Sequence, residues 1–167
     1  ALSEQRYRAS RSASHVFADH RAGLAARAPH PAPRRGRSQD RLILYLDIKG
    51  SIPFDTGQLS QILEGLSRLY YDAPGSTTSA LRTSAEELNR QLLAVNAGER
   101  AKGLQCVGLF TQIVFREGQV FMAQSGPVTA FLIAESGVQE YNESTLSGQG
   151  LGISESTTIR FTQVNLK

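Results

Sequence analysis

The chain has 167 residues, one cysteine and a formal net charge of +3. This length suits one domain and is short for two, and a single cysteine excludes an internal disulfide framework. No run of about 18 apolar residues occurs, so we expect a cytoplasmic protein with no membrane span.

The charge is divided unevenly along the chain. Residues 1–41 hold nine Arg against three acidic residues, a balance of +6, whereas residues 42–167 carry −3. Residues 1–40 are also rich in Ala, Ser and Pro, a composition that buries little apolar surface. We therefore interpret 1–40 as a largely flexible basic arm, with a weak strand signal only at 15–18, and 41–167 as the domain.

The domain begins with an apolar run at 42–46 that is typical of a buried strand. Asp55 and Gln58 have the spacing of a capping box, and apolar residues at helical intervals then predict a helix over 56–71. A second apolar stripe predicts a helix over 78–97, which Gly98 would end as the left-handed residue. These two helices should pack beside each other.

After residue 103 the spacing of apolar residues changes to that of strands. Tight turns at 116–118 and 135–137 join neighbouring strands as hairpins, so an antiparallel meander is expected. One strand, two helices and a meander together indicate a sheet covered by helices. The predicted strands of this region are 105–115, 119–124, 128–134, 138–141 and 157–164.

This order of elements resembles the metal-dependent protein phosphatases of the protein phosphatase 2C type, including their bacterial sporulation branch. The segment 44–48, Leu-Tyr-Leu-Asp-Ile, is similar to their Val-Ala-Asp-Gly motif, and 121–132 is similar to the strand and turn carrying Gly-Asp-Ser-Arg. The segment 150–153 is similar to their Leu-Gly stretch. The resemblance covers about 41–167 and implies an α+β fold, the N-terminal part of a four-layer α/β/β/α sandwich.

The resemblance also implies a chemistry, which is hydrolysis of a phosphoserine or phosphothreonine ester by water held between two Mg²⁺ or Mn²⁺ ions with aspartate ligands. Asp47 keeps the first carboxylate, but Ile48 replaces the glycine that follows it in the family. Pro127, Val128 and Thr129 stand where the family has Asp, Ser and Arg. The prediction is therefore Asp47 as a relic metal ligand, with no assigned catalytic residue and no cofactor.

Other candidate sites have structural interpretations. Arg37 and Asp40 lie too close to the first strand of the domain for the family's Arg/Glu/Asp motif, so we interpret them as a solvated linker.

The candidate nucleophiles and histidines also have structural interpretations. Cys106 lies in an apolar run, which indicates a core residue. Ser125 lacks the Gly-x-Ser-x-Gly pattern. An N-terminal nucleophile would need processing before a residue such as Thr77, and the spacing of His15, His20 and His30 predicts no metal site.

Three functions remain in view. The leading hypothesis is a catalytically inactive phosphatase-like domain, a pseudophosphatase, that binds a protein partner as a scaffold or regulator in bacterial signalling. The first alternative is an active Mg²⁺- or Mn²⁺-dependent serine/threonine phosphatase whose remaining ligands lie beyond residue 167. The second is a binder of nucleic acid or an acidic partner through the basic arm, which is less favoured because the arm has few aromatic residues.

Overall fold

A computed structural model describes residues 22–27, 36–135, 137–142 and 144–166 of the chain. The weak strand signal at 15–18 lies outside these residues. The elements in chain order are β1 (Ala22–Arg27), β2 (Arg41–Gly50), α1 (Thr56–Asp72), α2 (Thr77–Glu99), the short 3-10 helix η2 (Arg100–Lys102), β3 (Cys106–Arg116), β4 (Gln119–Ser125), β5 (Ala130–Ala134), β6 (Gly137–Tyr141), α3 (Ser144–Ser147) and β7 (Arg160–Asn165).

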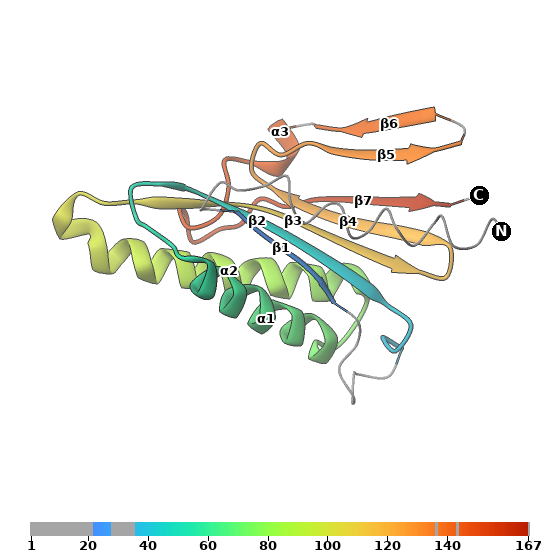
Figure 1. Ribbon diagram of the computed structural model, residues 1–167, viewed down its shortest axis with the longest axis horizontal. Coiled ribbons are helices and arrows are strands. Elements are labelled where there is room, and N and C mark those ends of the chain that lie inside the picture. Colours follow the sequence, from blue (N-terminus) through green and yellow to red (C-terminus); the bar gives the residue numbers. More distant parts are fainter. Residues whose placement is uncertain (1–21, 28–35, 136, 143, 167) are drawn as a thin grey trace.

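Five strands form one antiparallel sheet in the order β1-β2-β3-β4-β7, and β5 and β6 form a separate two-stranded sheet. Figure 1 shows α1 and α2 side by side on one face of the larger sheet, with β5 and β6 on the opposite side. The layers are therefore helix, sheet and sheet, which confirms the expected part of an α/β/β/α sandwich.

The core lies between the helix pair and the larger sheet. Alternate residues of β2 face the helices because successive side chains of a strand point to opposite faces. Each buried leucine of this layer contributes about 2 kcal/mol through removal of apolar surface from water. The largest fully buried side chains are Tyr70, Tyr71, Phe110, Leu42, Leu44, Leu46, Ile48, Leu66, Leu81, Leu88, Leu92 and Leu151.

The start of α1 confirms the predicted capping box, whereas the predicted end of α2 is wrong. Gln58 N donates to Asp55 Oδ1 at 2.7 Å, and Asp55 N donates to Gln58 Oε1 at 2.9 Å. α2 continues through Gly98, and the left-handed residue is Gly103, with φ +71. The last turn persists because Asn96 is hydrogen-bonded to the backbone of Cys106.

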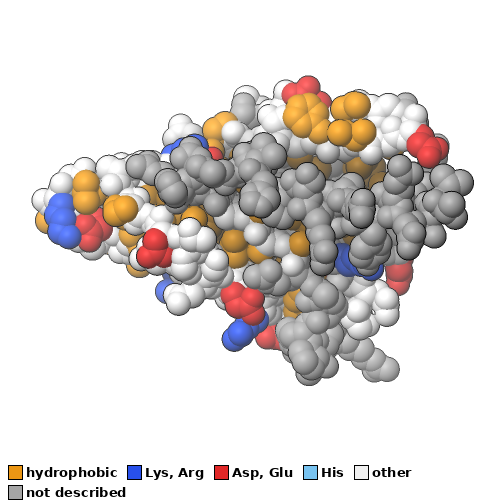
Figure 2. Space-filling view, in the orientation of Figure 1, with side chains coloured by type: hydrophobic (Ala, Val, Ile, Leu, Met, Phe, Trp, Pro, Cys, Tyr) orange, Lys and Arg blue, Asp and Glu red, His pale blue; other side chains and the backbone are white. Residues whose placement is uncertain are grey.

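The expected single meander is wrong for residues 130–141, which leave the larger sheet. Gly126, with φ +90, and the proline after it turn the chain away from the end of β4. β7 then occupies the place beside β4, with Arg160 opposite Gln124. One face of the small sheet exposes three apolar side chains (Figure 2), Phe131, Ile133 and Val138, and Glu140 opposite Phe131 shares this face.

Residues 22–27 fall in the segment that we interpreted as an arm, yet they form the edge strand β1 of the larger sheet. The two residues that are packed against the interior, Gly23 and Ala25, are small. A Cβ on Gly23 would lie 2.9 Å from Leu63 Cδ1 of α1, and Ala25 is 4% exposed. Four of the six residues of β1 are Ala or Gly, which have low strand propensity, so its sequence carries little strand signal.

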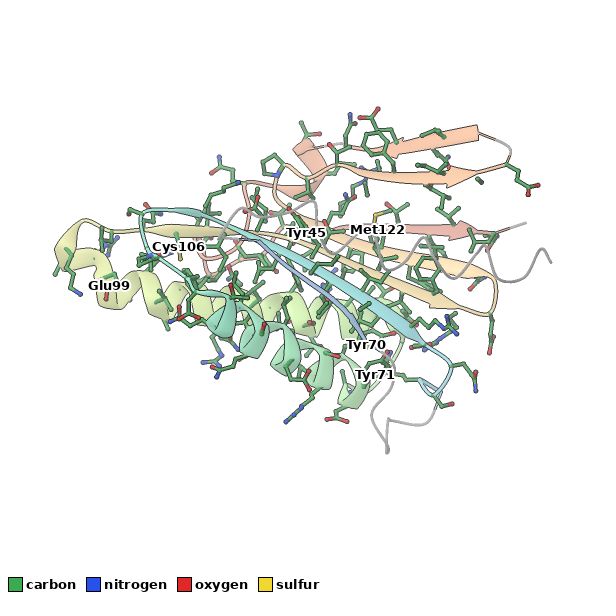
Figure 3. The ribbon with its side chains drawn as sticks, viewed as in Figure 1. Tyr45, Tyr70, Tyr71, Glu99, Cys106 and Met122 are labelled. Carbon is green, nitrogen blue, oxygen red and sulfur yellow. The ribbon has the colours of Figure 1, made fainter. Side chains whose placement is uncertain are left out.

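The interpretation of Arg37 and Asp40 as a solvated linker is also wrong, since both are buried. The Asp40 carboxylate accepts hydrogen bonds from Arg116 Nε at 2.6 Å, Arg116 Nη2 at 2.7 Å and Tyr70 Oη at 2.6 Å. Tyr71 Oη donates to the Asp40 carbonyl at 3.1 Å. Figure 3 shows both tyrosines at the C-terminal end of α1.

Arg37 fastens the same end of the molecule. Its Nη2 donates to the carbonyls of Ala73, Gly75 and Ser76 at 3.1–3.2 Å, and its guanidinium lies 4.8 Å from the Tyr70 ring centroid. We call Arg37, Asp40, Tyr70, Tyr71 and Arg116, with the carbonyl groups that Arg37 contacts, the Asp40 cluster. It joins the chain before β2 to the turn between the helices and to the β3–β4 hairpin.

Within the described ranges, no helix is both long and apolar enough to cross a membrane.

Candidate functional site

Asp47, the predicted metal ligand, lies near the end of β2 on the sheet face that points away from the helices. The alternation along β2 places it there, because Leu46 and Ile48 face the helix pair. Its Oδ2 lies 2.8 Å from Lys49 Nζ, and 16% of its side chain is exposed. Lys49 is two residues further along the strand and so projects from the same face. The carboxylate is therefore already paired with a cation of its own strand.

The second segment of the resemblance is the turn that follows β4. Gly126 N donates to Ser147 O and Ser147 Oγ donates to Gly126 O, both at 2.7 Å, so α3 holds the turn. Ser125 is buried and Pro127 is exposed. A proline has neither an N–H donor nor a side-chain ligand atom. The turn therefore brings no carboxylate toward Asp47.

Leu109 of β3 lies between these two segments. It is directly opposite Asp47 in the β2–β3 pair, so the two side chains share one face of the sheet. A Cβ placed on Gly126 would lie 2.6 Å from Leu109 Cδ2, which shows how closely the leucine approaches the turn. An apolar side chain thus separates the two segments that the resemblance would place at a metal site.

The glycine-rich segment 150–152 closes this end of the sheet. Leu151 exchanges two backbone hydrogen bonds with Gly108 of β3, at 2.8 and 2.9 Å. Gly150 has φ +115, and a Cβ there would lie 2.6 Å from Val107 Cγ2 and 2.9 Å from the Gly108 carbonyl oxygen. Only a residue without a side chain fits this approach of two backbones.

Two asparagines of α2 fasten segment 150–152, and the sequence analysis missed both. Gly152 N donates to Asn89 Oδ1 at 2.7 Å, and Asn96 Nδ2 donates to the carbonyls of Gly152 and Cys106 at 2.8 Å. Asn96 Oδ1 also accepts from Cys106 N at 2.7 Å. The sequence did contain a signal for them. Asparagine is a poor helix former, so two asparagines two turns apart on one face of a long helix indicate a tertiary contact on that face.

No family model matches the chain, and no curated protein matches it in sequence. Solved structures do match it. The catalytic domain of the serine/threonine protein phosphatase PstP, in complex with two manganese ions, is 17% identical with a TM-score of 0.60, over 88% of this chain and 74% of that one. Serine/threonine phosphatase Stp1 from Staphylococcus aureus is 14% identical with a TM-score of 0.59, over 87% and 71%.

PppA, described as a key regulatory component of the T6SS in Pseudomonas aeruginosa, is 14% identical with a TM-score of 0.57, over 88% of this chain and 72% of that one. The chain has the protein phosphatase 2C fold. At this level of identity the likeness concerns the fold alone, so the chemistry of this phosphatase 2C fold depends on its own residues.

Those residues do not fit a two-metal centre of the kind that PstP holds. Mg²⁺ and Mn²⁺ take several oxygen ligands, among which the protein supplies carboxylates and the remainder are largely water. Across the described ranges, no three His, Cys, Asp or Glu side chains gather at one place. Asp47 is the only acidic residue of the three segments that carry the resemblance, and Lys49 already pairs with it. Metal binding by Asp47 stays a prediction.

Nucleophilic chemistry has little support among the described residues of this phosphatase 2C fold. Cys106 is 1% exposed, and burial raises the pKa of its thiol, which opposes formation of a reactive thiolate. Its interpretation as a core residue is confirmed. Thr77 is buried at the start of α2. The three histidines lie outside the described residues.

Proposed function

We propose that this phosphatase 2C fold acts by binding a protein partner, as a catalytically inactive scaffold or regulatory domain in bacterial signalling in the cytoplasm. The observation that carries the proposal is the state of Asp47, whose carboxylate is paired with Lys49 and separated from the Gly126 turn by Leu109. Hydrolysis of a phosphoester would need carboxylates that hold cations between these two segments.

The residues of the turn support the same proposal. Pro127, Val128 and Thr129 carry no charge, so their side chains supply neither a carboxylate for a cation nor a cation for a phosphate. The structural neighbours are bacterial phosphatases, and one of them, PppA, is described as a regulatory component. A phosphatase fold that keeps its packing but has other residues at the metal-ligand positions is suited to binding a protein partner.

The test measures turnover and metal binding on the same sample. We expect no hydrolysis of p-nitrophenyl phosphate or a phosphothreonine peptide in Mn²⁺ above the value for an Asp47→Asn variant. We also expect Mn²⁺ to leave the melting temperature unchanged. A specifically bound metal at 100 times its Kd would add about 2.7 kcal/mol, a shift of several degrees.

Turnover that depends on Mn²⁺ and is lost in Asp47→Asn would overturn the proposal in favour of an active phosphatase. Asp55→Asn is the matched control, because Asp55 caps α1 at an exposed position away from the segments of the resemblance. It should leave both phosphatase readouts unchanged and change stability little, because asparagine caps a helix about as well as aspartate.

A further inference from the structure

A cavity of about 360 Å³ lies at the C-terminal end of α2, away from Asp47 and the Gly126 turn and bordered on one side by Gly152 and Ile153. Figure 3 shows that Glu99, at the end of α2, and Cys106, at the start of β3, lie at this same end of the molecule. The volume is within the range of small-molecule sites and holds roughly a dozen water-sized groups. The cavity is lined by Leu93, Asn96, Ala97, Arg100, Gly103, Leu104, Gln105, Gly152 and Ile153.

The lining has one cation and no carboxylate. Glu99, the nearest acid in sequence, is paired with Lys102 at 2.9 Å. Arg100 is exposed and makes no ion pair with any other described residue. Its guanidinium can therefore make a charge-assisted hydrogen bond to a ligand without first breaking one within the described domain.

The side-chain amide of Asn96, another polar group of the wall, is already occupied. The side-chain amide of Asn96 donates to two carbonyls and accepts from one N–H, as given above. The carbonyls of the last α2 turn are partly capped, since Gly103 N donates to Arg100 O and Leu104 N to Glu99 O. This capping reduces the partial negative charge of the helix end, so the full charge of Arg100 dominates.

The remaining lining is mixed, with four aliphatic side chains and the exposed, polar Gln105. Leu93 and Ala97 come from one face of α2, Leu104 from the loop before β3, and Ile153, which is 43% exposed, from the segment after Gly152. A wall of aliphatic and polar groups with one cation at its edge matches a small molecule with an apolar body and one anionic end.

We propose that this cavity binds a small organic anion with an apolar body, of the class of medium-chain or aromatic carboxylates. The site is independent of phosphoester chemistry and goes beyond the proposed function. The ligand would contact Gly152, which Asn89 and Asn96 fasten, and the neighbouring Ile153. Occupancy would therefore stabilise the loop that closes the sheet end beside the Gly126 turn.

The probe is octanoate, titrated into the ¹⁵N-labelled full chain and followed by amide chemical shifts. We expect saturable shifts at Ala97, Gly103, Gln105 and Ile153, with a Kd in the millimolar range. Octan-1-ol should bind about tenfold more weakly and octylamine more weakly still, because each lacks the charge that Arg100 recognises.

Arg100→Gln removes the charge and should raise the Kd for octanoate about tenfold. The matched control is Arg68→Gln, an exposed arginine on α1 that pairs with Glu64, which should leave the Kd unchanged within about twofold. Ala97→Phe adds a ring at an exposed helix position, where the chain should still fold, and should abolish the octanoate shifts by filling the cavity.

Three outcomes would overturn the proposal. They are the absence of saturable shifts at these amides up to about 20 mM octanoate, equal octanoate affinity in the Arg100→Gln variant, and octylamine binding as tight as octanoate. The amide spectrum of each variant shows whether it is folded, so a lost signal is assigned either to the site or to the fold.

Discussion

Two carboxylates at opposite ends of β2 have opposite surroundings. Asp40 directly precedes the strand, is completely buried, and accepts hydrogen bonds from the Arg116 guanidinium and the Tyr70 hydroxyl. Asp47 lies near the far end of the strand, where it pairs with the largely exposed Lys49. Buried ion pairs are strongly sensitive to loss of one partner, whereas exposed pairs contribute little.

The difference shows at which end of the sheet polar side chains contribute to the stability of the fold. The Asp40 cluster joins residues 30 to 76 positions apart in the chain, and so stabilises the sheet end away from the segments of the resemblance. At the end of the sheet near Asp47, asparagines and glycines hold the backbone, and Asp47 has no comparable set of hydrogen bonds. The following variants test whether stability is divided in this way.

Asp40→Asn should have the largest effect. It leaves the Arg116 guanidinium without its counter-charge in a partly buried position, and weakens the hydrogen bond from Tyr70. We expect a loss of about 3 kcal/mol in the free energy of unfolding, at the low end for buried pairs because 24% of the Arg116 side chain is exposed. Urea denaturation measures it. A loss below about 1 kcal/mol would show that the cluster behaves like a surface pair.

Gly126→Ala should have the next largest effect, about 2–3 kcal/mol, because a Cβ there meets Leu109 Cδ2 and the positive φ also disfavours alanine. Gly36→Ala is the matched control. Gly36 has φ +91, against +90 for Gly126, and no atom lies within 4 Å of its Cβ position. It should lose only the conformational part, about 1 kcal/mol. Equal losses in the two variants would argue against close packing of Leu109 on the turn.

The two tyrosines of the Asp40 cluster predict a decline of stability at high pH. Burial raises the pKa of Tyr71 to about 12, and burial with the hydrogen bond to Asp40 raises the pKa of Tyr70 as well. In the unfolded chain both titrate near pH 10. Between pH 10 and 12 the unfolded state therefore releases protons that the folded state retains, and the free energy of unfolding falls as pH rises.

The expected slope approaches 1.4 kcal/mol per pH unit for each of these tyrosines. Tyr71→Phe removes one of the two groups, so the decline above pH 10 should become about half as steep. Near neutral pH it should lose about 1 kcal/mol with the hydrogen bond to the Asp40 carbonyl. Denaturation curves at several pH values measure both effects, and an unchanged slope would contradict the assignment to Tyr71.

The elements that could be predicted from the sequence depend on neighbours in the chain. The apolar periods of α1 and β2 and the capping box at Asp55 and Gln58 are local features, and each is present in the structure. β1 could not be predicted, because its fit depends on the close approach of Leu63 to Gly23. The burial of Asp40 likewise depends on Arg116, which is distant in sequence.

The candidate site shows the same division. The segments that carry the resemblance, and the replacements at Ile48, Pro127, Val128 and Thr129, are visible in the sequence alone. The position of Leu109 between those segments follows from the register of β2 and β3, in which Asp47 is opposite Leu109. The roles of Asn89 and Asn96 depend on a loop more than fifty residues further along the chain.

Asp47→Asn should have the smallest effect, a loss below about 1 kcal/mol, because its ion pair with Lys49 is open to solvent on the lysine side. Lys49→Met provides the complementary test. It removes the competing ammonium while the carboxylate stays, so a latent metal ligand would then bind Mn²⁺ and raise the melting temperature. We expect no such rise, since a single carboxylate beside Leu109 offers too few oxygen ligands. A rise in Lys49→Met that is absent in the double variant with Asp47→Asn would show that the lysine alone masks the metal ligand.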